Sequence, residues 1–442
     1  MRRSVLMLAL VAALPLRVYP QVATTPPMGW NSWDSYGMTI TEAQFKQNVG
    51  WFHAHLQPSG WQYVVIDEGW YLASPQQADQ GYTLDANGRY VPAADRFPSA
   101  EEDRGFKPLA DYVHSLGLKF GIHIIRGIPK EAVKRNLPIA GSKYLAAEAA
   151  DTSDTCRWNR DNYGLKDNAA GQAYYDSLAN LYAGWGVDFV KVDCISQPYK
   201  TASIHMVSRA LKNTGRPIVL SLSPGPTPLA DASDVVRQAQ MWRISGDFWD
   251  VWNRDEASSD FPQSVVHQFP LLAQWQRYAG PGHWPDADML PIGWLGPQPG
   301  WQQARPSRLT PDETRTVLTL WAIARSPLIL GANLSRINSA TEAMLNNREV
   351  LAVDQHSTGN QARLHTAATW IWTARATSAK GEYVALFNVG NAPVDMQYTW
   401  QALGLSPGKH SARDLWLHKN KGKTAGIEVR LAPHASTLYR VE

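Results

Sequence analysis

The chain has 442 residues, of which 44% are hydrophobic, so it is long enough for a barrel-sized domain and one smaller domain, each with its own core. Its 42 Lys and Arg residues nearly balance its 39 Asp and Glu residues, and no long basic run is present, which argues against nucleic acid as a partner. Two cysteines exclude a cysteine-rich metal module and permit at most one internal disulfide, with two free thiols as the alternative.

The N-terminal segment has the features of a secretory signal. Met1, Arg2 and Arg3 precede an apolar stretch over residues 4–16, which is too short to span a bilayer. We therefore expect a signal peptide over residues 1–23, a secreted or periplasmic protein, and no membrane association once the signal is removed. An uncleaved amphipathic start is the alternative interpretation.

A repeated pattern after residue 23 predicts alternating helices and strands. A helical segment ends at a glycine and a strand follows at once, as it does at Gly60, Gly117, Gly186 and Gly215. The strands predicted after these glycines are mostly apolar, which is typical of parallel strands buried on both faces. They cover residues 61–67, 118–123, 187–193 and 216–222.

Four further strands complete the pattern up to residue 354. They cover residues 28–33, 240–245, 283–290 and 327–332, and helical patterns fall between strands at residues 170–183, 201–212, 264–278 and 310–324. The last helix opens with Thr310 and Pro311 followed by two acidic residues, a typical helix start. Eight alternating β and α units predict a (β/α)₈ TIM barrel over residues 24–354.

The remaining residues, 355–442, predict a small antiparallel β-sandwich that packs against the barrel. Short segments that alternate apolar and polar residues are separated by turn residues such as Gly381 and Gly422. The predicted strands cover residues 369–376, 382–389, 396–400, 410–416, 427–431 and 436–441.

Charged and aromatic side chains gather at the carboxyl ends of the predicted barrel strands, where barrel enzymes carry their reactive groups. The charged ones are Asp67, Glu68, Lys191, Asp193, Arg243, Asp247, Asp286 and Asp288. The aromatic ones are Trp30, Trp33, Trp70, Tyr71, Trp242, Trp249, Trp252 and Trp284. A lone strand-end Asp often caps a helix and many tryptophans belong to the core, but acids from four strands beside indole rings indicate a sugar pocket.

Two of these acids suit glycoside hydrolysis, which needs carboxyl groups on opposite sides of the scissile bond. Asp193 and Asp247 follow the fourth and sixth strands, so we expect them to face each other across the barrel mouth. Lys191 lies on the same face of its strand as Asp193, and we expect it to keep that carboxylate ionised. A buried structural ion pair is the alternative for Lys191. Arg243 is placed to bind a sugar hydroxyl or to orient one of the acids.

Several motifs resemble glycoside hydrolase family 27, the α-galactosidase family. They are MGWNSW at residues 28–33, VIDEGW at 65–70, FVKVDC at 189–194, WRISGD at 242–247 and GPGHWPDADML at 280–290. The resemblance implies a retaining exo-glycosidase that hydrolyses terminal α-D-galactosides of oligo- or polysaccharides by double displacement, with no cofactor and no metal. It makes Asp193 the nucleophile and Asp247 the acid/base. It also implies a disulfide between Cys156 and Cys194, and sugar-binding roles for Trp33, Asp67, Lys191, Arg243 and Asp288.

Three positions depart from the family pattern. Typical α-galactosidases have two aspartates after the second strand, whereas this chain has Asp67 and Glu68. The longer Glu68 would fill space left by a missing C6 group, so β-L-arabinopyranosidase activity is a close alternative. His123 stands where relatives often carry Tyr, and Ser223 lies in the loop that reads the sugar's 2-substituent in animal members; both are expected to contact substrate. The insertion over residues 126–151 would shape a leaving-group subsite or shield the barrel edge.

Two other classes of function compete with hydrolysis. Barrel carboxylates can hold Mg²⁺ for enolate chemistry and a strand-end lysine can form a Schiff base, but the key acids here come from strands that are not neighbours. A non-catalytic sugar-binding protein is expected to lack one of the two catalytic carboxyl groups, and both are present. Activity that survives EDTA and borohydride would exclude the first class, and release of nitrophenol from an aryl glycoside would exclude the second.

Overall fold

The computed structural model describes residues 22–77, 80–254, 261–296, 303–378 and 380–442. Nearly all of the predicted signal peptide lies outside the described residues. Within the described parts, no helix combines the length and apolar character needed to cross a membrane.

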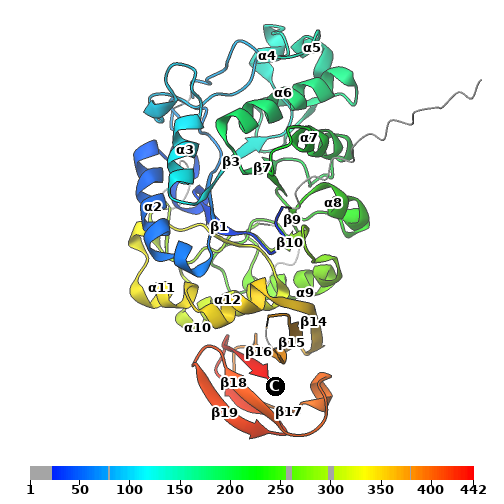
Figure 1. Cartoon of the computed structure of the whole chain (residues 1–442). Helices are drawn as coiled ribbons and strands as arrows, with labels where there is room; N and C mark the ends of the chain where they lie inside the picture. Colours follow the sequence, from blue (N-terminus) through cyan, green and yellow to red (C-terminus); the bar gives the residue numbers. More distant parts are fainter. Residues whose placement is uncertain (1–21, 78–79, 255–260, 297–302, 379) are drawn as a thin grey trace, which may run out of the picture.

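Eight parallel strands form the first domain and curl into a ring, which Figure 1 shows roughly end-on. Their order in the sheet is β10-β9-β8-β7-β3-β2-β1-β13. A parallel bridge between Leu290 and Leu330 joins the two ends of the sheet. The predicted barrel and all eight of its strands are confirmed. The strands are β1 (Met28–Asn31), β2 (Tyr63–Ile66), β3 (Lys119–Ile125), β7 (Phe189–Asp193), β8 (Val219–Leu222), β9 (Met241–Arg243), β10 (Trp284–Asp286) and β13 (Leu328–Leu330).

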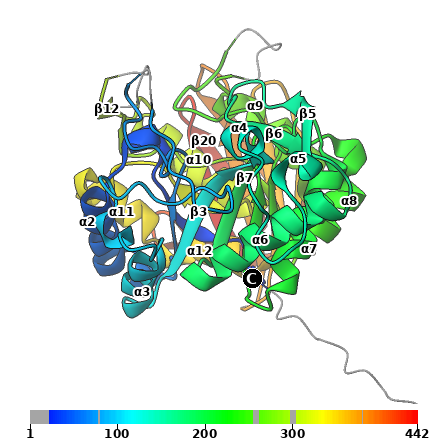
Figure 2. The ribbon, with the colours of Figure 1, turned by 90° about the horizontal axis from the view of Figure 1, so that it is seen from above.

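Helices surround this ring and cover the outer face of the strands, as the view from above in Figure 2 also shows. Local signals fix their ends: Asn168 caps the start of one helix, Gly186 ends it in a left-handed conformation at φ 87°, and Thr310 forms a capping box with Glu313. The helices are α1 (Trp33–Tyr36), α2 (Glu42–His55), α3 (Lys107–Ser115), α6 (Ala169–Trp185), α7 (Thr201–Asn213), α8 (Ala232–Gln238), α9 (Val265–Trp275), α10 (Pro311–Ala324), α11 (Ser339–Leu345) and α12 (Arg348–Gln355).

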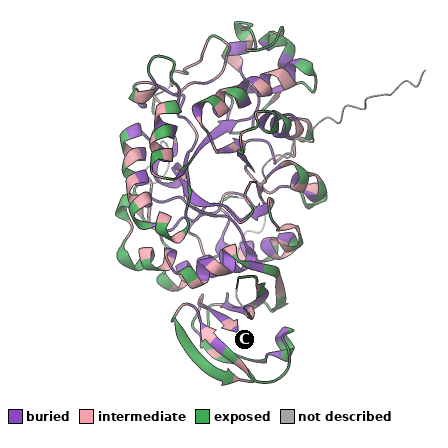
Figure 3. Cartoon of the chain, in the orientation of Figure 1, coloured by how far each residue is buried: buried purple, intermediate pink, exposed green. Residues whose placement is uncertain are grey.

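Burial follows the barrel geometry. The strands are buried along nearly their whole length, while most of the helices expose one face to solvent (Figure 3). Because the strands are buried on both faces, their sequences read as apolar runs rather than as alternating patterns.

The segment after β3 forms a small subdomain at the barrel mouth. It contains a three-stranded sheet of order β4-β6-β5 and two short helices. Their bounds are β4 (Ile128–Pro129), α4 (Lys130–Lys134), α5 (Ala146–Ala149), β5 (Ala150–Thr155) and β6 (Asn162–Leu165). The loop between β5 and β6, residues 156–161, carries Cys156, which is disulfide-bonded to Cys194 as predicted.

Two antiparallel sheets form the C-terminal domain. One has six strands in the order β14-β15-β16-β21-β18-β19, and the other pairs β17 with β20. A second apolar cluster that includes Ile371, Met396 and Trp400 joins the two sheets, which confirms the predicted sandwich. The strands are β14 (Ser357–His365), β15 (Thr369–Ala376), β16 (Glu382–Asn388), β17 (Val394–Thr399), β18 (His410–Asp414), β19 (Lys419–Thr424), β20 (Gly426–Leu431) and β21 (Ser436–Val441). β14 and β19 were not predicted from the sequence.

The sandwich packs on the barrel close to the loop that carries Asp247. Nδ1 of His434, in the turn before β21, lies 2.6 Å from Oε1 of Glu313 on α10. The ring of His434 also stacks on Trp252, with 4.1 Å between the ring centroids. A short hairpin of β11 (Trp294–Leu295) and β12 (Arg305–Pro306) lies next to α1.

Candidate active site

One pocket of about 300 Å³ at the carboxyl ends of the barrel strands collects most of the predicted site residues. Asp193 and Asp247 both line it, so the two candidate catalytic acids share one cavity. The other predicted residues that line it are Trp33, Asp67, Glu68, Lys191, Ser223, Arg243 and Asp288. Two of the predicted polar residues are not part of this lining: His123, and Asp286, which is buried and accepts the Asp288 backbone N–H at 2.9 Å.

Asp193 ends β7 and each of its carboxylate oxygens has a hydrogen-bonding partner. The indole nitrogen of Trp158 donates to Oδ1 at 3.0 Å, and Nε2 of His123 lies 3.3 Å from Oδ2. The Ser223 hydroxyl reaches Oδ2 at 3.5 Å. Burial alone raises the pKa of Asp193, but the hydrogen bond and charge of His123, with the charge of Lys191, lower it below its ordinary value. The carboxylate is therefore held ionised, as a nucleophile must be.

Lys191 lowers the pKa of Asp193 through its charge, as expected, and it also forms the structural ion pair that was the alternative. Its Nζ atom lies 2.8 Å from Oδ2 of Asp67, in a buried ion pair, and acts on Asp193 only through its charge. Alternate residues of a strand share a face, but the side chain of Lys191 extends toward β2 and meets the carboxylate that follows it. The Asn31 amide donates to the same Asp67 oxygen at 2.6 Å.

His123 lies beneath the pocket, next to Asp67 and Asp193, rather than on the pocket surface. Its side chain is 0% exposed, and Nε2 lies 4.0 Å from Oδ1 of Asp67 as well as near Asp193. Burial lowers the pKa of His123, but the charge of Asp67 and the hydrogen bond to Asp193 raise it above the ordinary value. The predicted contact of His123 with substrate is therefore replaced in this geometry by contacts with the acids.

Glu68 is fixed at the pocket wall by Asn159, a residue of the 156–161 loop. The Asn159 amide donates to Oε1 of Glu68 at 2.7 Å and to Oδ2 of Asp161 at 3.1 Å. Burial and the nearby charge of Asp193 raise the pKa of Glu68 to about 7, although His123 and Asn159 act in the opposite direction. Glu68 is thus near the midpoint of its titration at neutral pH.

Arg243 holds two acids on the opposite side of the pocket. Its guanidinium lies 2.8 Å from Oδ1 of Asp288 and 3.2 Å from Oδ1 of Asp247. Asp288 also accepts the Phe248 backbone N–H at 2.8 Å, and its burial raises its pKa to about 7. Asp247 is far more open, with its side chain 47% exposed, which leaves it free to meet a leaving group or a water molecule.

The family model of α-galactosidase A matches residues 25–133 and 161–356 of this chain. A second model, of the α-galactosidase C-terminal β-sandwich domain, matches residues 366–441. Together they cover both domains of the structure. The chain belongs to glycoside hydrolase family 27.

Known members of family 27 match the chain over nearly its whole length. The α-galactosidase A of Cellvibrio japonicus is 30% identical over 90% of this chain and 86% of its own. The solved structure of a family 27 β-L-arabinopyranosidase from Geobacillus stearothermophilus is 43% identical, covers 95% of this chain and 97% of its own, and superposes with a TM-score of 0.90. The α-galactosidase I of Mortierella vinacea is 26% identical, with the same coverage of both chains and a TM-score of 0.73. The protein is a glycoside hydrolase that acts on O-glycosyl bonds.

The predicted aromatic residues of this family 27 enzyme lie in three different places. Trp33 and Trp249 line the pocket, whereas Trp30, Trp70, Trp242 and Trp284 are fully buried in the core and Tyr71 is nearly so. Trp252 packs against the sandwich instead. Only some of the aromatic side chains that follow the strands therefore line the pocket, and the sequence does not show which, because core and pocket tryptophans look alike in a sequence.

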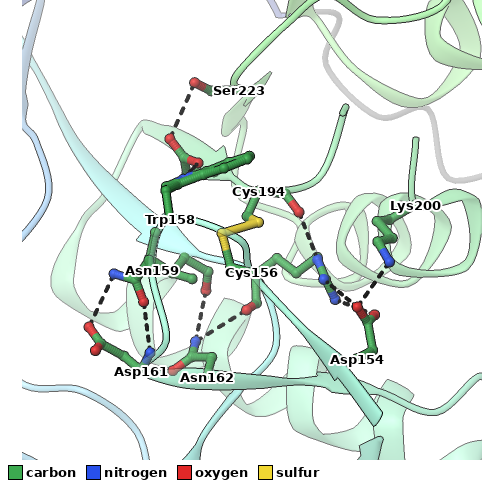
Figure 4. Close-up of a disulfide and its surroundings, with 12 residues drawn as sticks. Asp154, Cys156, Trp158, Asn159, Asp161, Asn162, Cys194, Lys200 and Ser223 are labelled. Atoms are coloured by element: carbon green, nitrogen blue, oxygen red, sulfur yellow. Dashed lines mark hydrogen bonds and ion pairs between the residues drawn. A yellow bond between two sulfur atoms is a disulfide. The ribbon is translucent and has the colours of Figure 1, made fainter. Parts of the chain in front are cut away.

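Two residues of the 156–161 loop were missed as site residues. Trp158 and Asn159 contact Asp193 and Glu68, yet they follow no strand of the barrel and belong to a polar stretch without periodicity. Figure 4 shows that the disulfide sits beside Trp158 and ties this loop to the end of β7. The resemblance to family 27 predicted the disulfide, and that pairing was the one indication in the sequence that this loop lies beside Asp193.

Asp34 is a third missed residue of the pocket lining. It is buried, and its Oδ2 atom has no hydrogen-bonding partner among the residues that the structure describes. Its side chain lies against Gly331, which follows β13, in the space that a Cβ at position 331 would need. Burial, with the nearby charge of Asp288, raises the pKa of Asp34 well above its ordinary value, so this acid favours its neutral form.

Proposed function

We propose that this enzyme removes terminal β-L-arabinopyranosyl residues from glycosides, with retention of anomeric configuration. The observation that carries the proposal is Glu68, fixed at the pocket wall by Asn159 at 2.7 Å. Terminal α-D-galactosides are the second candidate substrates, because members of the same family that share about 30% of its sequence are α-galactosidases.

The two sugars differ at one group, and Glu68 lies where that difference is expected to be read. β-L-Arabinopyranose has the ring and anomeric geometry of α-D-galactopyranose without the C6 hydroxymethyl group. A glutamate reaches about 1.5 Å further than an aspartate, roughly one C–C bond. Because Asn159 holds its carboxylate in place, Glu68 cannot easily swing aside to make room for C6.

The likeness to a solved arabinopyranosidase supports the same ranking. That structure is 43% identical to this chain, and a variant of the enzyme has been solved in complex with arabinose. The named α-galactosidases are more distant, at 30% and 26% identity. One methylene group usually discriminates between substrates by only about 1–3 kcal/mol, so we expect a preference and measurable activity on both sugars.

The proposed mechanism is a double displacement. The carboxylate of Asp193 attacks the anomeric carbon while Asp247 gives its proton to the departing oxygen, and the C–O bond to the leaving group breaks. Asp247 then takes a proton from water as that water attacks the anomeric carbon. The bond to Asp193 breaks, and its carboxylate regains the negative charge.

The surroundings of the two acids support the proposed roles. Asp193 has a lowered pKa and accepts hydrogen bonds at both oxygens, whereas Asp247 is half-exposed and is restrained through Arg243. Lys191, Asp67 and Asp288 remain candidates for the sugar hydroxyls. The disulfide is compatible with the expected secreted or periplasmic location, since such bonds persist in oxidising compartments.

A paired assay tests the substrate proposal. The parent, Glu68→Asp and the control Glu428→Asp, an exposed position on β20, are compared on aryl β-L-arabinopyranoside and aryl α-D-galactopyranoside. We expect the parent to prefer the arabinoside in kcat/KM, Glu68→Asp to shift the ratio at least tenfold toward the galactoside, and the control to leave it unchanged. A parent that prefers the galactoside would contradict the proposal.

A further inference from the structure

The 156–161 loop contacts the nucleophile candidate directly through one side chain. The indole N–H of Trp158 donates to Oδ1 of Asp193 at 3.0 Å, although Trp158 is 49% exposed and belongs to the subdomain after β3 rather than to a barrel strand. Burial stabilises the position of an exposed tryptophan only weakly, so the position of Trp158 depends on the contacts that hold the loop.

Two tethers hold this loop beside Asp193. Cys156 lies two residues before Trp158, and its disulfide partner Cys194 directly follows Asp193, so the bond joins the two chain segments next to the hydrogen bond. Arg126 adds a second tether: its Nε donates to the Cys194 carbonyl at 2.7 Å, and its guanidinium binds both carboxylate oxygens of Asp154 on β5 (Figure 4).

We propose that Trp158 is a positioning residue for the nucleophile and assists the breakdown of the covalent intermediate. The inference rests on the proposed function, in which Asp193 forms a glycosyl ester. An N–H group binds a carboxylate more strongly than it binds a neutral ester oxygen. The Trp158 bond therefore strengthens as charge returns to Asp193 in the second step and weakens as charge leaves in the first.

This asymmetry predicts which kinetic constants depend on Trp158. Removing the N–H destabilises the free carboxylate and the second transition state relative to the covalent intermediate. Breakdown of the intermediate then slows, and the intermediate accumulates. The first step is not slowed, because its starting carboxylate loses at least as much stabilisation as its transition state does.

Trp158→Phe is the test variant, because phenylalanine keeps an aromatic ring and lacks the donor. On the better aryl glycoside we expect kcat and KM to fall together by about tenfold, with kcat/KM within about threefold of the parent. Rapid mixing is expected to give a burst of nitrophenol approaching one per active site. Intact mass spectrometry is expected to show protein heavier by one glycosyl residue.

The matched control is Trp51→Phe, the same change on α2, where Trp51 stacks on His55. We expect Trp51→Phe to have the same kcat, the same KM and the same burst amplitude as the parent. If Trp158 had only a structural role, Trp158→Phe would lower kcat/KM together with kcat and would give no burst of nitrophenol. That result, or an unchanged kcat in Trp158→Phe, would overturn the proposal.

The disulfide gives a second and independent arm. The paired change Cys156→Ala with Cys194→Ala releases the loop, and we expect it to lower kcat and KM in the same direction as Trp158→Phe. A pair variant that is folded by circular dichroism and has parental kcat would overturn the role of the tether. Failure of the proposed function looks different: the parent would turn over neither glycoside, or Asp193→Ala would keep its activity.

Discussion

Lys191 and Asp67 form a largely buried ion pair, with 2.8 Å between Nζ and Oδ2, that links the ends of β7 and β2 across the intervening strand β3. The lysine thereby compensates an acid that burial alone would drive toward its neutral form, and the pair holds the pKa of Asp67 well below its ordinary value. The charge of Lys191 also lowers the pKa of Asp193.

Lys191→Ala is expected to leave Asp67 as an unpaired buried charge. Loss of one partner from a buried pair typically costs about 3–5 kcal/mol of unfolding free energy, which urea denaturation at pH 7 would measure. Because the pKa of Asp67 is depressed in the folded state, its contribution to the free energy of unfolding is present above the pKa of the unfolded chain, near 3.9. This contribution is lost as the pH falls below that value. The cost of Lys191→Ala should therefore shrink below about pH 4. A cost that persists unchanged at lower pH would contradict this role.

Glu68→Gln tests the raised pKa of Glu68, because glutamine keeps the shape of a neutral carboxyl and can still accept from Asn159. The folded parent holds a proton on Glu68 up to about pH 7, whereas the unfolded chain releases it near pH 4.3. Between these values the folded state binds more protons, so the parent loses stability relative to the variant as pH rises. We expect the difference in unfolding free energy to change by up to about 3 kcal/mol between pH 4 and pH 8. No change over this window would refute the assignment.

Gly331→Ala tests the packing of Asp34. A Cβ at position 331 would overlap the Asp34 carboxyl group, so the substitution is expected to cost about 1–3 kcal/mol of unfolding free energy. Gly50→Ala on α2, where a Cβ meets nothing within 4 Å, is the control and should not destabilise the protein. Combining Gly331→Ala with Asp34→Ala should recover most of the loss. If the double variant is as unstable as the sum of the single ones, the two residues are not coupled.

The barrel was predictable because its strands carry a strong signal. Apolar runs after helix-ending glycines located four of the eight strands, and continuing the same alternation located the other four, among them β1 at Met28–Asn31 and β13 at Leu328–Leu330. The two missed strands of the sandwich, β14 and β19, lie at the two edges of the six-stranded sheet, and their residues are mostly exposed. An edge strand with both faces in solvent has no hydrophobic alternation for a sequence reading to detect.

The site was predictable where the barrel geometry dictates position. Asp67, Asp193 and Asp247 follow strands, and parallel strands in a barrel deliver such residues to one mouth. Trp158 and Asn159 reach the same pocket through a loop whose path depends on a disulfide and on Arg126, and no local pattern encodes that path. The choice of Asp67 over Asp193 as the partner of Lys191 depends on side-chain reach from β7 across β3 to the end of β2, which spacing along one strand does not contain.

Proton NMR of the first-formed sugar tests the roles of Asp193 and Asp247 most directly. When the enzyme hydrolyses aryl β-L-arabinopyranoside, we expect the initial anomeric signal to be that of β-L-arabinopyranose, with the α form appearing only through slow mutarotation, and we expect Asp193→Ala to form almost no product. Initial appearance of the α anomer would mean a single displacement by water, and would contradict a covalent intermediate on Asp193.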